Sequence, residues 1–172
     1  MQQLLGSRTL HRKSGFARMS GFVMVLAALL CGPALLCGPA FAQTPEESAT
    51  REALKVMDAF MAAFNGKDVP AWADTLVYPH VRIASGKVAV FPDRAAFIAA
   101  HDMNAFATST GWARSTWDDL KVVQASADKV HIAVKFTRYD AEDRVISAYD
   151  SLYVVERVDG RWGVRARSSF AP

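Results

Sequence analysis

Cysteine is almost absent from this chain of 172 residues, which contains only Cys31 and Cys37. Both lie within residues 1–42, a segment that we expect to be removed, so the 130 residues that follow contain none. This composition excludes a disulfide framework, a zinc site built on thiolates and a thiol nucleophile in the mature protein. Its stability must then come from an ordinary apolar core, for which a chain of this length suffices.

The N-terminal segment has the three parts of a secretory signal peptide. Residues 1–18 carry four Lys or Arg and no acid, residues 19–36 are almost wholly apolar, and Ala40-Phe41-Ala42 forms a small-x-small site before Gln43. We therefore predict cleavage after Ala42 and export to the periplasm or the exterior of a bacterium. The leucine before each cysteine disfavours a lipid anchor, and a Gly-Pro break in a stretch of about 18 residues disfavours a permanent membrane span.

An excess of one charge is also lacking once this segment is removed. Residues 43–172 contain 16 Lys or Arg and 17 Asp or Glu, a net charge of −1, so the sequence pI near 9.0 reflects the export signal. A nucleic-acid partner is therefore not expected, because such partners require a basic surface. No association with a membrane is expected after cleavage.

Motifs for metals and cofactors are missing from the mature sequence. Its three histidines, His80, His101 and His131, do not pair with each other or with a carboxylate at a known ligand spacing. There is also no glycine-rich phosphate loop and no G-x-S-x-G sequence. We predict neither a metal site nor a cofactor.

The first half of the mature chain has helical patterns. Thr44-Pro45-Glu46-Glu47 is typical of a capped helix start, and apolar residues then recur at spacings of three and four until Asn65-Gly66. A short second helix is predicted from Asp68, a hairpin over residues 81–90, and a third helix over residues 94–106.

The second half has strand patterns. Residues 120–123, 130–136, 146–158 and 162–170 alternate or are rich in β-formers, and short turn sequences separate them. Consecutive strands joined by tight turns predict an antiparallel meander. With the helices grouped ahead of it, the fold class is α+β in one domain.

This order of elements, and a last strand that begins Asp159-Gly160-Arg161-Trp162, resembles the nuclear transport factor 2-like superfamily in its SnoaL-like or ketosteroid isomerase-like branch. The resemblance covers residues 46–170. It implies a curved antiparallel sheet wrapped around the N-terminal helices into a cone with a pocket, a cystatin-like α+β barrel roll, often paired as a homodimer. One departure concerns the isomerase branch, which uses an acidic base near the first strands, whereas residues 75–92 contain no Asp or Glu.

Three polar side chains stand where the second helix leads into the first strand. Tyr78, His80 and Arg82 share a parity, so in extended backbone they point to one side. If that side is the pocket, His80 is a candidate general acid or base, Tyr78 its helper and Arg82 a holder of an anionic group. If it faces solvent, Val81 and Ile83 face the core instead.

Other candidates lie on later elements. His101 falls in the apolar stripe of the third predicted helix, either as a core group or lining the pocket, and Asp102 beside it is either an exposed residue or the partner of an imidazole. Trp117 is expected to pack in the core or at a pocket rim. Tyr149 and Arg165 line the cavity under one strand parity and face outward under the other, a choice that a single bulge would reverse.

These features favour an exported domain that binds a small, partly apolar molecule or an acidic ligand. The alternative is a cofactor-independent dehydratase, isomerase or cyclase that uses His80 in acid-base catalysis. A third possibility is an interaction module that works through its sheet face.

Overall fold

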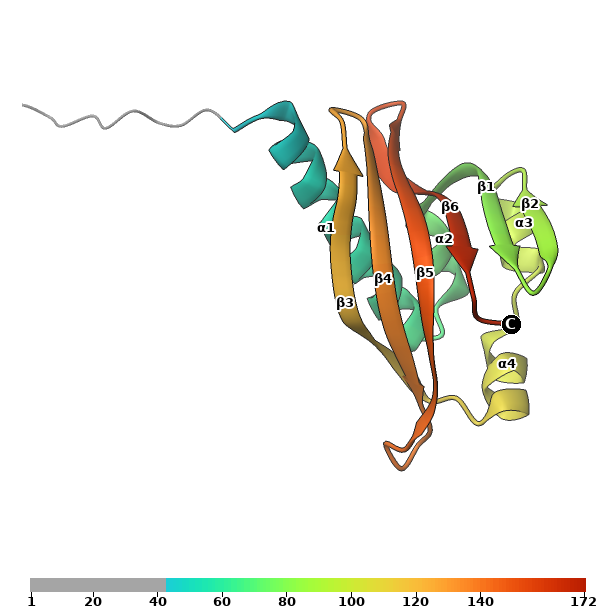
Figure 1. Cartoon of the computed structure of the whole chain (residues 1–172). Helices are drawn as coiled ribbons and strands as arrows, with labels where there is room; N and C mark the ends of the chain where they lie inside the picture. Colours follow the sequence, from blue (N-terminus) through green and yellow to red (C-terminus); the bar gives the residue numbers. More distant parts are fainter. Residues whose placement is uncertain (1–42) are drawn as a thin grey trace, which may run out of the picture. The chain divides into compact units, whose positions relative to one another are not determined.

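The computed structural model describes residues 43–172 (Figure 1). The predicted signal peptide, its cleavage site and both cysteines lie outside these residues. Within them, no helix has the length and apolarity needed to cross a membrane. The elements in chain order are α1 (Pro45–Asn65), α2 (Val69–Asp74), β1 (Leu76–Ala84), β2 (Lys87–Phe91), α3 (Arg94–Ala99), α4 (Met103–Thr110), β3 (Arg114–Ala125), β4 (Lys129–Tyr139), β5 (Val145–Val158) and β6 (Arg161–Ser169).

Helix α1 begins with the predicted capping box. The Glu47 amide donates to the Thr44 hydroxyl at 3.1 Å, and the Thr44 amide donates to the Glu47 carboxylate at 2.9 Å. Two amides that the helix itself cannot satisfy are thereby paired. One face of the helix is buried against the sheet, through Ala49, Ala53, Met57 and Phe60.

The six strands form one sheet in the order β2-β1-β6-β5-β4-β3. Strands β3 to β6 make the predicted antiparallel meander, and β1 and β2 make the predicted hairpin, with positive φ at Ser85 and Gly86. The α+β class is confirmed, but the sheet is mixed rather than wholly antiparallel because β1 pairs with β6 in parallel. Two strands so far apart in sequence are joined by a long crossover, and such a connection permits parallel pairing.

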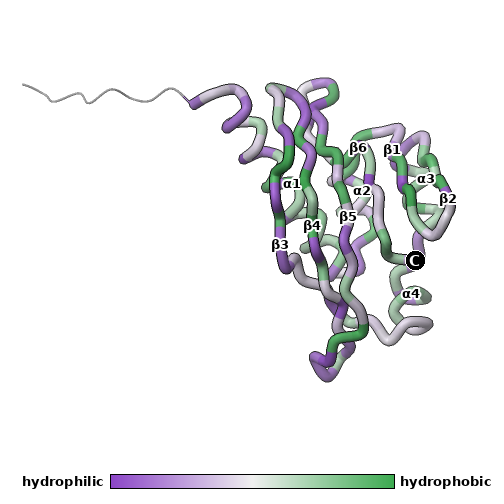
Figure 2. Tube along the Cα trace, in the orientation of Figure 1, coloured by the Kyte–Doolittle hydropathy of each residue, from purple (hydrophilic) through white to green (hydrophobic). Residues whose placement is uncertain are grey.

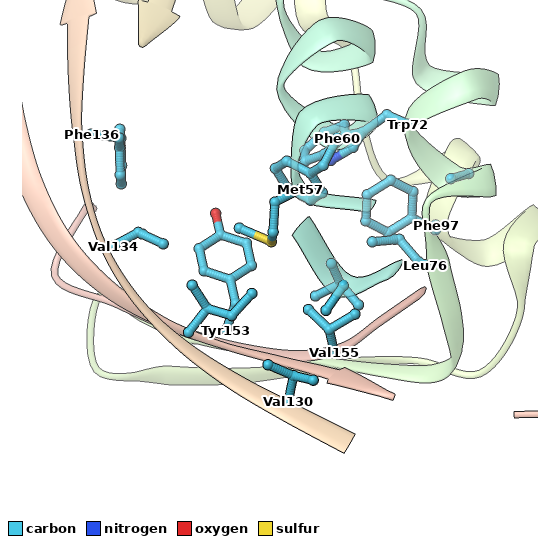
Figure 3. Close-up of a cluster of buried hydrophobic side chains, with 14 of the residues drawn as sticks. Met57, Phe60, Trp72, Leu76, Phe97, Val130, Val134, Phe136, Tyr153 and Val155 are labelled. Carbon is cyan, nitrogen blue, oxygen red and sulfur yellow. The ribbon is translucent and has the colours of Figure 1, made fainter. Parts of the chain in front are cut away.

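The core lies between the helices and one face of the sheet. In Figure 2 the hydropathy colours vary along the strands, and on β4 the buried positions Val130, Ile132 and Val134 alternate with more exposed ones. Figure 3 shows side chains of α1 and α2 meeting those of the sheet. The ring of Phe60 lies edge-on to Trp72 and to Tyr153, with centroids 5.5 Å apart in both pairs. Each such buried side chain contributes about 1.5–3 kcal/mol to stability.

The helix predicted over residues 94–106 is two helices, α3 and α4. Asp102 has extended backbone, with φ −117° and ψ 101°, and its carboxylate accepts hydrogen bonds from the amides of Asn104 and Ala105 at 3.0 and 2.9 Å. It is therefore the N-cap of a new helix, and a continuous helix cannot pass through it. His101 consequently lies at the break between two helices rather than at the centre of one.

Candidate functional site

A cavity of about 310 Å³ opens between the helices and strands β1, β2, β4 and β6. Its volume is in the range of sites for small molecules. Its aromatic lining residues are Phe60, Phe64, Trp72, Phe91, Phe97 and Phe106. Its ionisable lining residues are His80, Arg82, His101, Asp102, Arg138 and Arg167.

Three arginines from three strands converge on this cavity, and none of them pairs with an Asp or Glu side chain of residues 43–172. Among residues 43–172, no Asp or Glu side chain forms an ion pair with Arg82, Arg138 or Arg167, whereas other arginines form such pairs. Arg82 donates to the main-chain oxygen of Pro172 at 3.1 Å, and Arg167 donates to the Tyr153 hydroxyl at 3.4 Å. The buried Nε of Arg138 has no hydrogen-bond partner within the described part of the chain.

The arginines repel one another in a partly dry environment. Burial is the main cause that lowers the pKa of Arg82, and the positive charge of Arg167 and then of Arg138 lowers it further. Burial likewise lowers the pKa of Arg138, and Arg167 adds to the shift. A guanidinium stays charged despite such shifts. Asp102 is the one acidic side chain among the lining residues, against three arginines, so the lining carries an excess of positive charge, which attracts anions.

The guanidinium of Arg138 is held in place by aromatic rings. Its central carbon lies 5.1 Å from the ring centre of Phe106, 5.4 Å from that of Tyr149 and 5.6 Å from that of Phe136. These distances permit cation–π attraction. Tyr149 thus contacts a cavity residue but does not line the cavity itself.

A bulge in β6 decides which arginine of that strand enters the cavity. Val164 pairs with Val155 of β5, and the next partner on β5 pairs with Ala166, so Arg165 is an extra residue. Side chains beyond the bulge change face, which places Arg167 on the same side as buried Val164. Arg165 is instead on the outer side, where it donates to Glu156 at 2.7 Å. Of the two alternatives for Arg165, the structure therefore shows the outward one, and Arg167 lines the cavity instead.

Strand β4 supplies the other arginine that the sequence interpretation missed. Arg138 has the same parity as the core residues of β4, so the alternation of that strand, extended by one step, would have placed it inward. Trp117 lines a smaller hollow of about 20 Å³ beside the cavity, where Arg138 and Arg167 also border it. Its indole N–H donates to the main-chain oxygen of Met57 at 3.3 Å. Trp117 is thus a packing residue at a rim.

His80 lines the cavity but is nearly inaccessible, with 4% of its surface exposed. Its Nδ1–H donates to the main-chain oxygen of Val164 at 3.0 Å, because a carbonyl can only accept. Burial is the main cause that lowers its pKa to about 4. The ring is therefore neutral at pH 7 and a weak base, which disfavours the predicted role in proton transfer.

Tyr78 does not join His80 and Arg82 in the cavity. Its hydroxyl donates to the main-chain oxygen of Ala73 at 2.9 Å, and burial raises its pKa to about 12. The pairing of β1 with β6 is irregular between Leu76 and Val81, which interrupts the regular alternation on which the prediction rested. Of the three residues predicted to point to one side, His80 and Arg82 line the cavity and Tyr78 does not.

His101 lies in the cavity wall and Asp102 at its edge. The Nδ1–H of His101 donates to the main-chain oxygen of Phe97 at 2.7 Å, and the two rings stack with centroids 4.1 Å apart. Burial is the main cause that lowers the pKa of His101. Asp102 is exposed and caps α4 rather than orienting an imidazole.

The arrangement is suited to recognition of an anion. It combines fixed positive charge, aromatic walls and two neutral imidazoles, and the residues in the described range include no cluster of side chains able to hold a metal ion. Guanidinium groups bind carboxylates and phosphates through paired hydrogen bonds, while aromatic walls accept an apolar body.

Comparisons with known proteins agree with this architecture. Residues 51–169 match the family model described as NTF2-like protein (DUF6841). An NTF2-like protein with a cystatin-like fold from Novosphingobium aromaticivorans is 13% identical, with a TM-score of 0.59 over 72% of this chain and 81% of that one. Aln2 from a Streptomyces species is 21% identical, with a TM-score of 0.58 over 74% and 94% of the two chains. A protein from Catenulispora acidiphila in complex with S-DNPA is 18% identical, with a TM-score of 0.57 over 72% and 92%. No curated protein matches the chain.

Proposed function

The chain belongs to the nuclear transport factor 2-like family, and from this premise we propose that it is an exported protein that binds a small anionic molecule with an apolar body. The observation that carries the proposal is the convergence of Arg82, Arg138 and Arg167 on an aromatic cavity, where none of them pairs with an Asp or Glu side chain of residues 43–172. The complex of the Catenulispora acidiphila protein with S-DNPA supports the use of this fold to hold a ligand.

Binding of an anion would offset the repulsion among the guanidiniums. A hydrogen bond to a charged group contributes about 1.5–3 kcal/mol. Two arginines that each donate hydrogen bonds to one carboxylate would therefore supply most of the affinity of a small ligand. The apolar part would lie against the rings of Phe91, Phe97 and Trp72, which line the same cavity. Water leaves these surfaces when the ligand enters, which adds to the affinity.

Two matched probes test this proposal. Isothermal titration calorimetry compares 2-naphthoate with 2-naphthamide, a neutral compound of nearly the same shape. We expect the acid to bind at least about tenfold more tightly, since the amide offers the guanidiniums a single uncharged acceptor oxygen in place of the two oxygens of a carboxylate. Raising the salt concentration should weaken binding of the acid only.

Two substitutions on β6 compare an arginine that lines the cavity with one that lies on the outer side of the sheet. Arg167→Gln should reduce the affinity for naphthoate at least about tenfold, and Arg165→Gln should leave it within twofold, because the bulge places Arg165 on the outer side. Equal affinity for acid and amide, or equal effects of the two substitutions, would overturn the proposal.

We also propose that the protein forms a homodimer through the outer face of its sheet. Ile83 of β1 and Leu152 of β5 both pair with Ser168 of β6, so their side chains point to the same side, where they are 47% and 41% exposed. Val88, the partner of Ile83 on β2, extends this apolar stripe. Apolar residues aligned across strands in this way are typical of an interface.

A further inference from the structure

One ring nitrogen of His101 forms a hydrogen bond within the part of the chain that the structure describes, and the other does not. Its Nδ1 is 2.7 Å from the main-chain oxygen of Phe97. A carbonyl oxygen only accepts, so Nδ1 carries the proton and Nε2 of the neutral ring is an acceptor. Within residues 43–172 no group donates a hydrogen bond to this Nε2.

The ring of His101 is held firmly in the cavity wall. It stacks on Phe97 with an interplanar angle of 28°, and Trp72 meets it edge-on with centroids 5.0 Å apart. The neighbouring carboxylate of Asp102 is engaged in capping α4. A ligand in the cavity therefore meets a fixed acceptor at this point of the wall.

The surroundings keep this acceptor neutral. Burial lowers the pKa of His101, and the positive charges of Arg167 and Arg82 lower it further. The same positive charges repel any ammonium group. The donor that complements this acceptor is therefore an uncharged one, and a hydroxyl is the simplest.

We propose that the ligand of this cavity is an apolar acid that carries a hydroxyl group, with the acid on the arginines and the hydroxyl donating to Nε2 of His101. This proposal rests on the proposed function, because it adds a second anchor to the same ligand. The guanidiniums lie on β1, β4 and β6 and the imidazole lies at the α3–α4 break, so the two anchors would contact different groups of one molecule.

The test uses 2-naphthoate, its singly hydroxylated isomers and the corresponding methoxy compounds, titrated by calorimetry into the wild type and His101→Phe. Phenylalanine retains the stacked ring without the acceptor, and the Phe97 carbonyl keeps the amide of Ala100 as a donor at 3.2 Å. We expect at least one hydroxy isomer to bind the wild type about 5- to 10-fold more tightly than naphthoate, which is the effect of one good hydrogen bond.

His101→Phe should abolish this advantage, so that the ratio of the affinity for the hydroxy isomer to the affinity for naphthoate falls to about one in the variant. The methoxy compounds, which cannot donate, should show no advantage in either protein. His101→Gln, whose side-chain oxygen accepts, should restore part of it. If naphthoate binds but no hydroxy isomer gains affinity, or if the gain survives in His101→Phe, this inference is wrong and the proposed function stands. If neither naphthoate nor any of its derivatives binds with an affinity that depends on Arg167, both the proposed function and this inference are wrong.

Discussion

Acidification between pH 7.5 and pH 5 should destabilise this protein through His80. The folded imidazole has a pKa near 4, and the same group in the unfolded chain has its ordinary value near 6.5. Above pH 6.5 the ring is neutral in both states. Between pH 6.5 and 4 the unfolded chain binds a proton that the folded protein does not, so stability falls as the pH falls, and it levels off below pH 4.

The size of this effect follows from the pKa difference. One pKa unit corresponds to about 1.4 kcal/mol, so His80 should remove roughly 2 kcal/mol by pH 5 and roughly 3 kcal/mol by pH 4. For a domain of this length, 2 kcal/mol corresponds to a fall in Tm of roughly 6–10 °C. His101, whose pKa is also lowered mainly by burial, should add to the loss in the same direction.

Urea denaturation followed by tryptophan fluorescence, at half-unit steps from pH 7.5 to 5, measures this slope. The range stops above the region in which Asp74, Asp140 and Glu156, whose pKa values are lowered mainly by hydrogen bonds from basic side chains, would add their own loss. His80→Phe and His101→Phe should each flatten the profile, His80→Phe more strongly. A flat wild-type profile, or an unchanged slope in His80→Phe, would refute this reasoning.

Four further predictions concern other parts of the molecule. Asp102→Ala should destabilise the protein by about 1 kcal/mol in thermal melts through loss of the α4 cap, with naphthoate affinity within twofold, whereas Asp102→Asn should retain the stability. Arg167→Met should raise the stability of the ligand-free protein by about 1 kcal/mol, because it removes an unpaired charge from the cavity, and a lower Tm would contradict this. Light scattering at micromolar concentration should give the mass of a dimer for the wild type and of a monomer for Leu152→Lys. The intact mass of the exported protein should match a chain that begins at Gln43. A mass that includes residues 19–42 or an attached lipid would refute cleavage after Ala42.

The predicted elements that proved correct depend on local sequence signals. The capping box at Thr44 and Glu47 fixes the start of α1 through bonds within three residues, and the alternation along β4 depends on neighbours in the same strand. Arg138 could have been found in the same way. The break at Asp102 also has a local signal, since Asp is a preferred N-cap, but the apolar spacing on both sides of it resembles one long helix.

The positions of Arg165 and Arg167 could not be read from the sequence. They have the same parity, and only the pairing of β6 with β5 decides that an extra residue is inserted between Val164 and Ala166. The parallel pairing of β1 with β6 is likewise a contact between distant parts of the chain. Strand alternation predicts which side chains share a face only as long as the register is regular.

The charge of the candidate site is also a property of the fold rather than of composition. Residues 43–172 have a net charge of −1, which on its own gives no reason to expect an anion site. The acidic side chains that form ion pairs in residues 43–172 do so with other cations, as Glu156 does with Lys129 and Arg165. Three charges of one sign in a partly buried cavity destabilise the free protein, and the proposed anionic ligand would offset that cost on binding. A net charge of −1 is thus compatible with a local excess of positive charge at the cavity.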